Sequence, residues 1–535
     1  MTKRKPSAPV FKPYVMNQIA LMPASYEEVI PAGHLVRVVN QTIETINIQA
    51  LLDQYAGGGA SSYHPKMMLK VLVYAYCKKI YTSRKIAEAL RENIYFMWLG
   101  GGNTPDFRTI NEFRGKRMKP VIAEVFSVVV EYLIAGGYIK LENYYLDGTK
   151  IEADGNKHKV VWDKRKNRYE QNVKEQIKEL LKVIDAENEK EEAEYGDKDL
   201  ETMGGNGSSG VNAEELKKKI NELNERLKAI TQKEKETGGK KSKTARQALK
   251  KLEDDCLPRL EKYEEQTRTL AGRKSYSKTD PDATCMRMKE DRGAEKAWPK
   301  PAYNIQIGTE DQFVVGYSVH NKSSDPICLI PHLEGVRKGI GKLPKNVIAD
   351  AAYGSEENYG YVEEKKLGNY LKYTTFYQDT HHYRNQDVLR SHQFRSYNFK
   401  YDEEKDQFIC PGQKRLSYLY TSKSKSDNGY DSTRRVYESE GCQACPLKEQ
   451  CTKAKGNRQI QVSFKLMEYR RQARENLTSE RGKKLRAKRS VEVETVFGHL
   501  KYNQGFRRFH LRSLEKVNTE WGLVCIAHNM QKLAG

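Results

Sequence analysis

Two apolar runs that each lead into an aspartate constrain most strongly how this chain can fold. Residues 144–146 precede Asp147, and residues 347–349 precede Asp350. Short runs of this composition are typical of strands that are buried in a sheet. A third acid, Glu494, lies in a segment with helical spacing. Because the three acids are far apart in the chain, only the fold can unite them, and we predict an α/β domain that does so.

Each of these acids also has a purely structural interpretation. Asp147 begins an Asp-Gly pair, which is a strong signal for a hairpin turn, and residues 139–154 alternate like two strands around such a turn. Asp350 precedes an expected helix, and its carboxylate can accept hydrogen bonds from amides of the loop that leads into that helix. A glutamate on a helix is most often solvated, and Glu492 competes with Glu494 for any role in a site.

The charge of the chain favours a polyanionic partner. Lys and Arg number 93 against 71 Asp and Glu, which gives a formal net charge of +22 over 535 residues. Nucleic acid is the commonest partner for such an excess, although a protein can also be basic without binding one. Three converging carboxylates can bind two divalent cations and drive phosphodiester chemistry. The expected substrate is therefore DNA.

Targeting signals are not evident in the sequence. No apolar run approaches the roughly 20 residues that cross a bilayer. The basic first residues, Met-Thr-Lys-Arg-Lys-Pro, are not followed by the apolar segment of a secretory signal. We therefore expect a cytoplasmic protein.

Composition and periodicity divide the chain into segments. A stretch dominated by Lys and Glu, with apolar residues at helical spacing, interrupts the strand-rich part and predicts a helical, coiled-coil insertion. The predicted domains are 1–135, an N-terminal helical DNA-binding domain; 139–156 and 271–375, the first parts of the catalytic core; 157–270, the coiled-coil insertion; 376–465, a zinc-ribbon-like insertion; and 466–535, the C-terminal helical part of the core.

The N-terminal domain has the pattern of a helix-turn-helix. Helices are expected after His64, Thr82 and Asp106, and a Gly-rich turn precedes the third, which is basic. The alternative is an ordinary helical bundle whose basic face is solvated. The side chains of this region expected to contact DNA are Arg108, Arg114, Lys116 and Arg117.

Four of the nine cysteines have the spacing of a metal site. Cys442-x2-Cys445-x5-Cys451 follows Cys410, which opens Cys-Pro-Gly. In a chain expected to be cytoplasmic, thiolates at this spacing predict a structural Zn²⁺ rather than disulfides. Reduced free thiols or an iron–sulfur cluster are the alternatives.

Seven short motifs are distributed along the chain. They are LDGTKIEAD (146–154), SKTDPDA (277–283), YNIQ (303–306), ADAAYG (349–354), VETVFGHLK (493–501), FRRF (506–509) and AHN (527–529). As a set, and in their order, they resemble the DDE transposases of bacterial insertion sequences. The closest likeness is to the IS1182-type branch of the IS4/IS5 superfamily, and it spans nearly the whole chain.

The resemblance implies a ribonuclease-H-like core in which Asp147, Asp350 and Glu494 bind two Mg²⁺ or Mn²⁺ ions. It further implies a transposase that cuts double-stranded DNA at the terminal inverted repeats of its own insertion sequence and joins the ends to target DNA. A homodimer on nucleoid DNA is expected. The superfamily's Tyr-x2-Arg-x3-Glu-x6-Lys signature is met at Lys501, whereas Arg489 lies one position from the expected place. The basic residues expected to contact DNA phosphates here are Lys501, Arg507, Arg508 and Arg512.

Two other functions fit the same sequence. A transposase-derived DNA-binding protein could have lost catalysis, although an intact set of three acids argues against this. A hydrolytic nuclease with the same core would cut DNA without joining it. Metal-dependent cleavage would exclude the first, and strand transfer would exclude the second.

Overall fold

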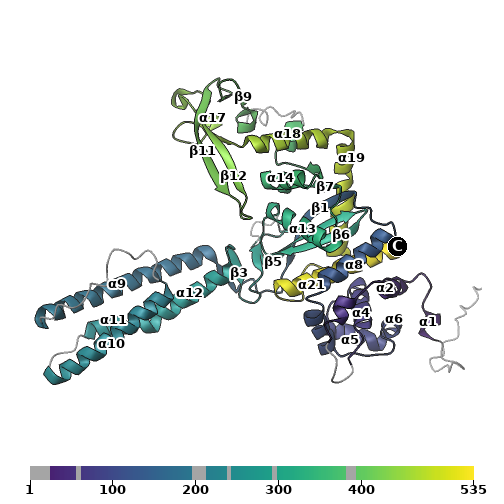
Figure 1. The fold of residues 1–535 in the computed structure, drawn as a ribbon, viewed down its shortest axis with the longest axis horizontal. Coiled ribbons are helices and arrows are strands. Elements are labelled where there is room, and N and C mark those ends of the chain that lie inside the picture. Colours follow the sequence, from purple (N-terminus) through teal and green to yellow (C-terminus); the bar gives the residue numbers. More distant parts are fainter. Residues whose placement is uncertain (1–24, 56–61, 196–211, 238–242, 292–297, 381–392) are drawn as a thin grey trace, which may run out of the picture.

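The computed structural model describes residues 25–55, 62–195, 212–237, 243–291, 298–380 and 393–535. This part of the chain forms a mixed α/β core. A group of N-terminal helices, a long helical arm and a separate five-stranded sheet are arranged around that core (Figure 1).

The core is built on a six-stranded sheet with β1 (Asn143–Glu152) near its centre. β1 runs antiparallel to β5 (Lys300–Glu310) and parallel to β7 (Asn346–Ala349). β6 (Phe313–His320) and β4 (Thr284–Met286) pair with the other edge of β5, and β8 (Gly368–Leu371) lies parallel to β7. The two aspartates therefore come from neighbouring parallel strands. The tight turn between β5 and β6 lies at Asp311 and Gln312, both of which have positive φ.

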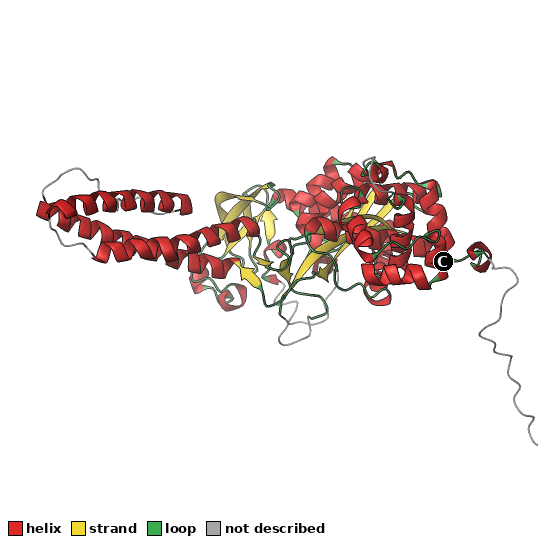
Figure 2. Ribbon diagram, turned by 90° about the horizontal axis from the view of Figure 1, so that it is seen from below, coloured by secondary structure: helices red, strands yellow, loops and turns green. Residues whose placement is uncertain are grey.

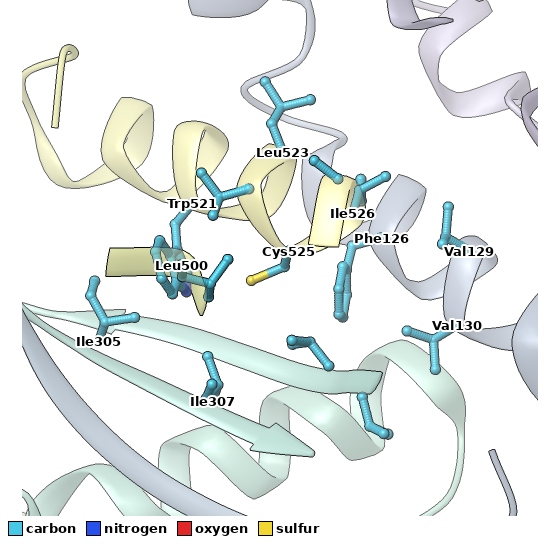
Figure 3. Close-up of a cluster of buried hydrophobic side chains, with 14 of the residues drawn as sticks. Phe126, Val129, Val130, Ile305, Ile307, Leu500, Trp521, Leu523, Cys525 and Ile526 are labelled. Carbon is cyan, nitrogen blue, oxygen red and sulfur yellow. The ribbon is translucent and has the colours of Figure 1, made fainter. Parts of the chain in front are cut away.

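Helices cover this sheet and supply its hydrophobic core. Figure 3 shows side chains of α8 (Ile122–Ala135) and of the C-terminal helix α21 (Leu514–Ala534) meeting Ile305 and Ile307 of β5. The sequence predicted that α8 belongs to the N-terminal domain. It packs instead on α21 and on α13 (Leu329–Ile340), because its side chains are apolar on nearly every face.

The N-terminal helices begin where the sequence predicted. His64, Thr82 and Asp106 each accept a backbone N–H at the start of α4 (Pro65–Cys77), α5 (Ser83–Glu92) and α7 (Phe107–Glu112). α4 packs on α21, and the Gln531 side chain donates to the Cys77 carbonyl at 2.8 Å. The other elements here are α1 (Tyr26–Val29), α2 (Leu35–Thr45), α3 (Gln49–Leu52), α6 (Ile94–Leu99) and the π-helix η1 (Phe113–Arg117).

The predicted helical insertion forms an arm that extends away from the core in both views (Figures 1 and 2). Its elements are α9 (Asp163–Tyr195), α10 (Ala213–Thr237), α11 (Lys243–Lys251), η2 (Leu252–Cys256) and α12 (Leu257–Leu270). Val173, Ile177 and Leu216 lie in its buried apolar seam. β2 (Val160–Trp162) pairs with β3 (Ser275–Ser277) where the arm joins the core.

A second sheet follows the core strands in sequence. Its order is β13 (Gln459–Val462), β12 (Asp431–Ser439), β11 (Arg415–Lys425), β10 (Gln407–Ile409) and β9 (Lys400–Asp402), all antiparallel. Its small core contains Phe408, Leu416 and Tyr437. Short helical segments accompany the strands: η3 (Pro326–Cys328), η4 (Ala351–Tyr353), α14 (Glu356–Glu364), α15 (Phe376–Thr380), η5 (Ser396–Asn398), η6 (Cys442–Ala444) and α17 (Lys448–Cys451).

A run of helices then returns to the core sheet. It comprises α18 (Phe464–Thr478), α19 (Glu480–Arg489), the π-helix η7 (Ser490–Glu494), α20 (Thr495–Gly498) and the π-helix η8 (His499–Asn503). η7 packs across β1 and β5. Across the described ranges, no helix combines the length and apolar character needed to cross a membrane.

Candidate active site and basic surface

Asp147 and Asp350 lie side by side at the middle of the core sheet. β1 and β7 are paired in parallel with Leu146 opposite Ala349, so the next residue of each strand is an aspartate. Asp350 ends β7 and accepts the Ala352 N–H at 2.9 Å. Asp147 accepts the N–H of Gly148 at 2.8 Å and is 7% exposed.

The hairpin predicted at Asp147-Gly148 was wrong. Residues 143–152 form one continuous strand that passes straight through Gly148. A Cβ at Gly148 would overlap the side-chain amide of Gln306 on β5, so the glycine makes room for a neighbouring strand rather than for a turn. The Gln306 amide is held by Asn304 at 3.1 Å and accepts the Tyr353 hydroxyl.

Glu494 reaches the same place from the helical side, through Arg489. The Arg489 guanidinium pairs with Asp147 at 3.0 Å and with Glu494 at 3.1 Å. Counting along an α-helix puts Arg489 one residue too far from Glu494. η7 is a π-helix, in which residues five apart lie on one face, and it restores the two side chains to a common face.

Glu492, the competing acid, lies elsewhere. It is 1% exposed, accepts the Gln312 backbone N–H at 2.7 Å and pairs with Lys488 at 3.0 Å. Its carboxylate therefore fastens η7 to the turn between β5 and β6. Glu494 is the acid that shares a partner with Asp147, and its side chain is 56% exposed.

The electrostatics of the site are dominated by the burial of Asp147. Burial raises the pKa of the Asp147 carboxyl, and the nearby Arg489 and Lys289 act in the opposite direction, whereas Asp350 adds to the rise. Lys289 also donates to the Gly148 carbonyl at 3.1 Å. Burial likewise raises the pKa of Tyr353 well above its usual value, with Asp147 contributing. Arg489 and Lys289 thus offset part of the cost of burying a charged Asp147.

The donor chemistry of this site fits a divalent ion. Carboxylate oxygens are the ligands that Mg²⁺ prefers, and carboxylates are what Asp147, Asp350 and Glu494 would supply. In the arrangement described, Arg489 lies between two of these carboxylates. Within the described ranges, no group of three or more His, Cys, Asp or Glu side chains is arranged to hold a metal ion.

Several of the predicted DNA-contacting residues line two neighbouring surface grooves. One groove, of about 790 Å³, is lined by Arg108, Lys116, Arg512 and also by Arg84 and Lys516. The other, of about 720 Å³, is lined by Arg508 and Arg512 with Lys157, Lys159 and Lys300. Asp154 lies in both grooves and pairs with Arg508 and Arg512 at 2.9 Å. Arg507 is exposed and stacks on Tyr502.

Three of the predicted DNA contacts do not face such a surface. Arg114 is 3% exposed and donates to Tyr76 and to the Tyr81 carbonyl. Lys501 is 7% exposed and pairs with Glu290 at 2.8 Å, and burial lowers its pKa.

Arg117 is half-buried, lies over the Tyr55 ring and donates to the Gln54 carbonyl. Arg114, Lys501 and Arg117 are therefore engaged with the protein itself, and their contact with DNA stays a prediction.

The four grouped cysteines line one small cavity of about 20 Å³ beside the second sheet. Backbone N–H groups of Lys414 and Arg458 each point at a sulfur, of Cys410 and Cys442 respectively, at 3.3 Å. N–H groups aimed at sulfur stabilise thiolates that bind metals. The cavity has room for one atom-sized guest. Across the described residues all cysteines are free of disulfides.

Sequence reasoning missed the residues that contact or position the acids without being acids themselves. The sequence left the role of Arg489 open, because it lies one position from the expected place, and it assigned no role to Gln306, Tyr353 or Lys289. A run such as Ser-Val-Glu-Val-Glu, with two β-branched residues inside a helix, is a weak signal for the irregular turn that places Arg489. Gln306 and Tyr353 do fall inside two of the motifs quoted above, so the motif set was the available signal.

Comparison with known proteins gives two family matches. Residues 24–116 match the family described as Transposase domain (DUF772), and residues 409–534 match the family described as Transposase DDE domain. The second match contains Glu494 and the four grouped cysteines, whereas Asp147 and Asp350 lie outside both. No curated protein and no solved structure matches the chain. The wider IS4/IS5 label is not supported, but a transposase domain near each end is typical of the DDE transposases of the IS1182 type.

Proposed function

We propose that this transposase cuts DNA at the ends of its own insertion sequence and joins those ends to target DNA, with Asp147, Asp350 and Glu494 as its catalytic acids. The observation that carries the proposal is the juxtaposition of the three acids. Two are adjacent across paired parallel strands, and the third shares Arg489 with the first.

The sheet supports a ribonuclease-H-like core. Its strand order, β6-β5-β1-β7-β8, combines an antiparallel meander with two parallel strands beside β1. The helix that bears the third acid packs across β1 and β5. The Glu494 side chain is itself open to solvent.

Two Mg²⁺ or Mn²⁺ ions held by the three acids would lower the pKa of an attacking water or hydroxyl and stabilise the leaving oxygen. The residues of the chain do the remaining work. Asp147 and Asp350 are placed by neighbouring strands of one sheet. Arg489 neutralises Asp147 and Glu494 and is positioned to release them when a stronger cation enters.

The basic grooves would hold the DNA. Arg108 and Lys116 come from the N-terminal helices, and Arg508 and Arg512 come from the loop before α21, so one duplex could bridge both parts. The four cysteines would bind a structural Zn²⁺ that orders the second sheet. A homodimer is proposed because two DNA ends must be processed together.

Strand cleavage of a duplex carrying the sequence that flanks the gene tests the proposal. Wild type, Asp350→Asn and Glu494→Gln would be compared in Mg²⁺ or Mn²⁺, with Asp254→Asn on the exposed arm as the matched control. Cutting at a fixed boundary by wild type and control alone supports a transposase. Cutting without joined products supports a nuclease, and binding without cutting supports an inactive DNA-binding protein.

A further inference from the structure

The hairpin formed by β11 and β12 leaves its sheet and continues as an isolated two-stranded ribbon. β10 pairs only with residues 415–417 of β11, and β13 pairs only with residues 435–438 of β12. From Thr421 to Arg434 no other strand of the described chain pairs with the hairpin, and most of its side chains are exposed. An isolated hairpin is marginally stable in water, so a ribbon of this kind needs another reason to persist.

The ribbon is held at its tip by α14, the helix that follows Asp350 in the sequence. The Ser426 hydroxyl donates to Glu357 at 3.0 Å, and the Tyr430 hydroxyl donates to Glu356 at 2.9 Å. Both glutamates lie in the first turn of α14, which begins six residues after Asp350. Figure 1 shows β11 and β12 running from the second sheet toward the core. The ribbon therefore forms a strut between the second sheet and α14.

Large side chains are exposed on this strut. Tyr418, Leu419 and Tyr420 are 43%, 49% and 48% exposed, and the pairing register shifts between Tyr418 and Tyr420, so Leu419 is the extra residue of a β-bulge. Bulges re-aim side chains and are often found near functional sites. Three consecutive large side chains left in solvent mark a contact surface.

The surroundings of these side chains favour a polyanion. Residues 415–439 contain five Lys and Arg against three Asp and Glu, and hydroxyl side chains fill most other exposed positions. Lys423 and Arg434 are exposed and make no ion pair within the described residues. Cations, hydroxyls and tyrosines together are the groups that bind DNA phosphates, and a two-stranded ribbon fits the major groove.

We propose that the β11–β12 ribbon binds double-stranded DNA and leads it to the three acids. The inference rests on the proposed function, because a DNA-binding ribbon is useful only if the chain cuts DNA. Lys423 and Arg434 would contact phosphates, and Tyr420 and Leu419 would lie against the duplex.

Fluorescence anisotropy with a labelled duplex of mixed sequence, over a range of NaCl concentrations, tests this. The variant is Lys423→Gln with Arg434→Gln. The control is Lys338→Gln with Lys342→Gln, which removes two exposed cations at the opposite end of β7. Each lost phosphate contact lowers the slope of log affinity against log salt by about 0.9, so we expect a fall of about 1.8 in the variant and none in the control. Equal slopes in all three proteins would overturn the proposal.

A photocrosslinking residue in place of Tyr420 gives a second readout that does not depend on weakened binding. We expect a protein–DNA crosslink there and none from the same residue in place of Tyr138, which is similarly exposed just before β1. A crosslink from position 420 to a second protein chain would overturn the inference. Normal DNA cleavage with no crosslink and unchanged slopes would sink the ribbon proposal alone, whereas a wild type that binds no DNA would sink the proposed function with it.

Discussion

Arg489 donates to Asp147 at 3.0 Å and to Glu494 at 3.1 Å, so a single guanidinium joins the central strand of the core to the helix that carries the third acid. Both Arg489 and Asp147 are nearly buried, whereas Glu494 is open to solvent. The pair is therefore a structural support as well as part of a site. Removing Arg489 should therefore lower the free energy of unfolding, whatever its effect on catalysis.

Arg489→Met leaves Asp147 buried without its nearest cation. Breaking a buried ion pair by removing one partner costs about 3 kcal/mol or more, so we expect the free energy of unfolding of the metal-free variant to fall by about that amount. Urea denaturation measures it. Arg471→Met is the control, because Arg471 pairs with Glu468 and Glu475 on an exposed helix face, where such pairs contribute less than about 1 kcal/mol.

The deficit of Arg489→Met should depend on pH. Burial already raises the pKa of Asp147, and loss of Arg489 raises it further. A carboxyl whose pKa is higher in the folded than in the unfolded protein lowers stability as pH rises through that interval. The gap in unfolding free energy between variant and wild type should thus widen upward from about pH 4, the unfolded value, and level off above the folded pKa. A gap that stays constant across this window would show that Asp147 does not titrate against Arg489.

Arg489 and a divalent ion should compete for the same carboxylates. Mg²⁺ that binds the folded state raises Tm by mass action, and the rise is larger when the site is not already neutralised. We expect Mg²⁺ to raise the Tm of Arg489→Met more than that of wild type. Thermal unfolding with and without Mg²⁺ measures this. Equal shifts in both proteins would mean that the ion binds elsewhere.

Much of this site could be predicted from the sequence, because the two strand-end aspartates and their hydrophobic runs are local features. The parallel pairing that sets Asp147 beside Asp350 follows from ordinary strand register. Arg489 could not be placed, because its position depends on one extra residue in a π-turn that α-helical counting does not include. The Asp-Gly turn signal failed because Gln306, distant in sequence, fills the space beside Gly148.

The basic residues show a second limit of prediction from sequence. Composition predicted a DNA-binding surface, but it could not distinguish a free cation from one already paired within the protein. Lys501 meets Glu290 from a distant part of the chain, and Arg114 is enclosed by Tyr76 and Tyr81. Such pairings depend on tertiary packing, which a sequence pattern does not contain.

Substitution of Glu492 should lower stability, whereas substitution of Glu494 should abolish activity. Glu492→Ala leaves the Gln312 N–H without its acceptor and Lys488 without a buried partner, so we expect a loss of about 2 kcal/mol in unfolding free energy. Cleavage by the protein that remains folded should persist. Glu494→Ala should unfold like wild type and fail to cleave. Loss of cleavage in a fully folded Glu492→Ala protein would reverse the assignment of the third acid.

Gly148 and Gln306 should be energetically coupled. Gly148→Ala drives a methyl group into the Gln306 amide, which is held by Asn304 and Tyr353, and overpacking of this kind costs about 1–3 kcal/mol. In Gly148→Ala/Gln306→Ala the methyl group has room. The double variant should therefore lose less stability than the sum of the single variants. Strict additivity would show that the two positions do not touch.

The cysteine group provides a test that is independent of DNA. If Cys410, Cys442, Cys445 and Cys451 bind zinc, the purified chain should contain about one zinc per molecule by elemental analysis. Cys445→Ser should lose that zinc and destabilise the small sheet beside it, since metal binding and folding are coupled in such sites. Cys285→Ser is the matched control, because Cys285 is partly exposed like Cys445 but belongs to the core. Zinc retained by Cys445→Ser, or absent from the wild type purified without chelator, would leave these thiols as ordinary lining of the cavity.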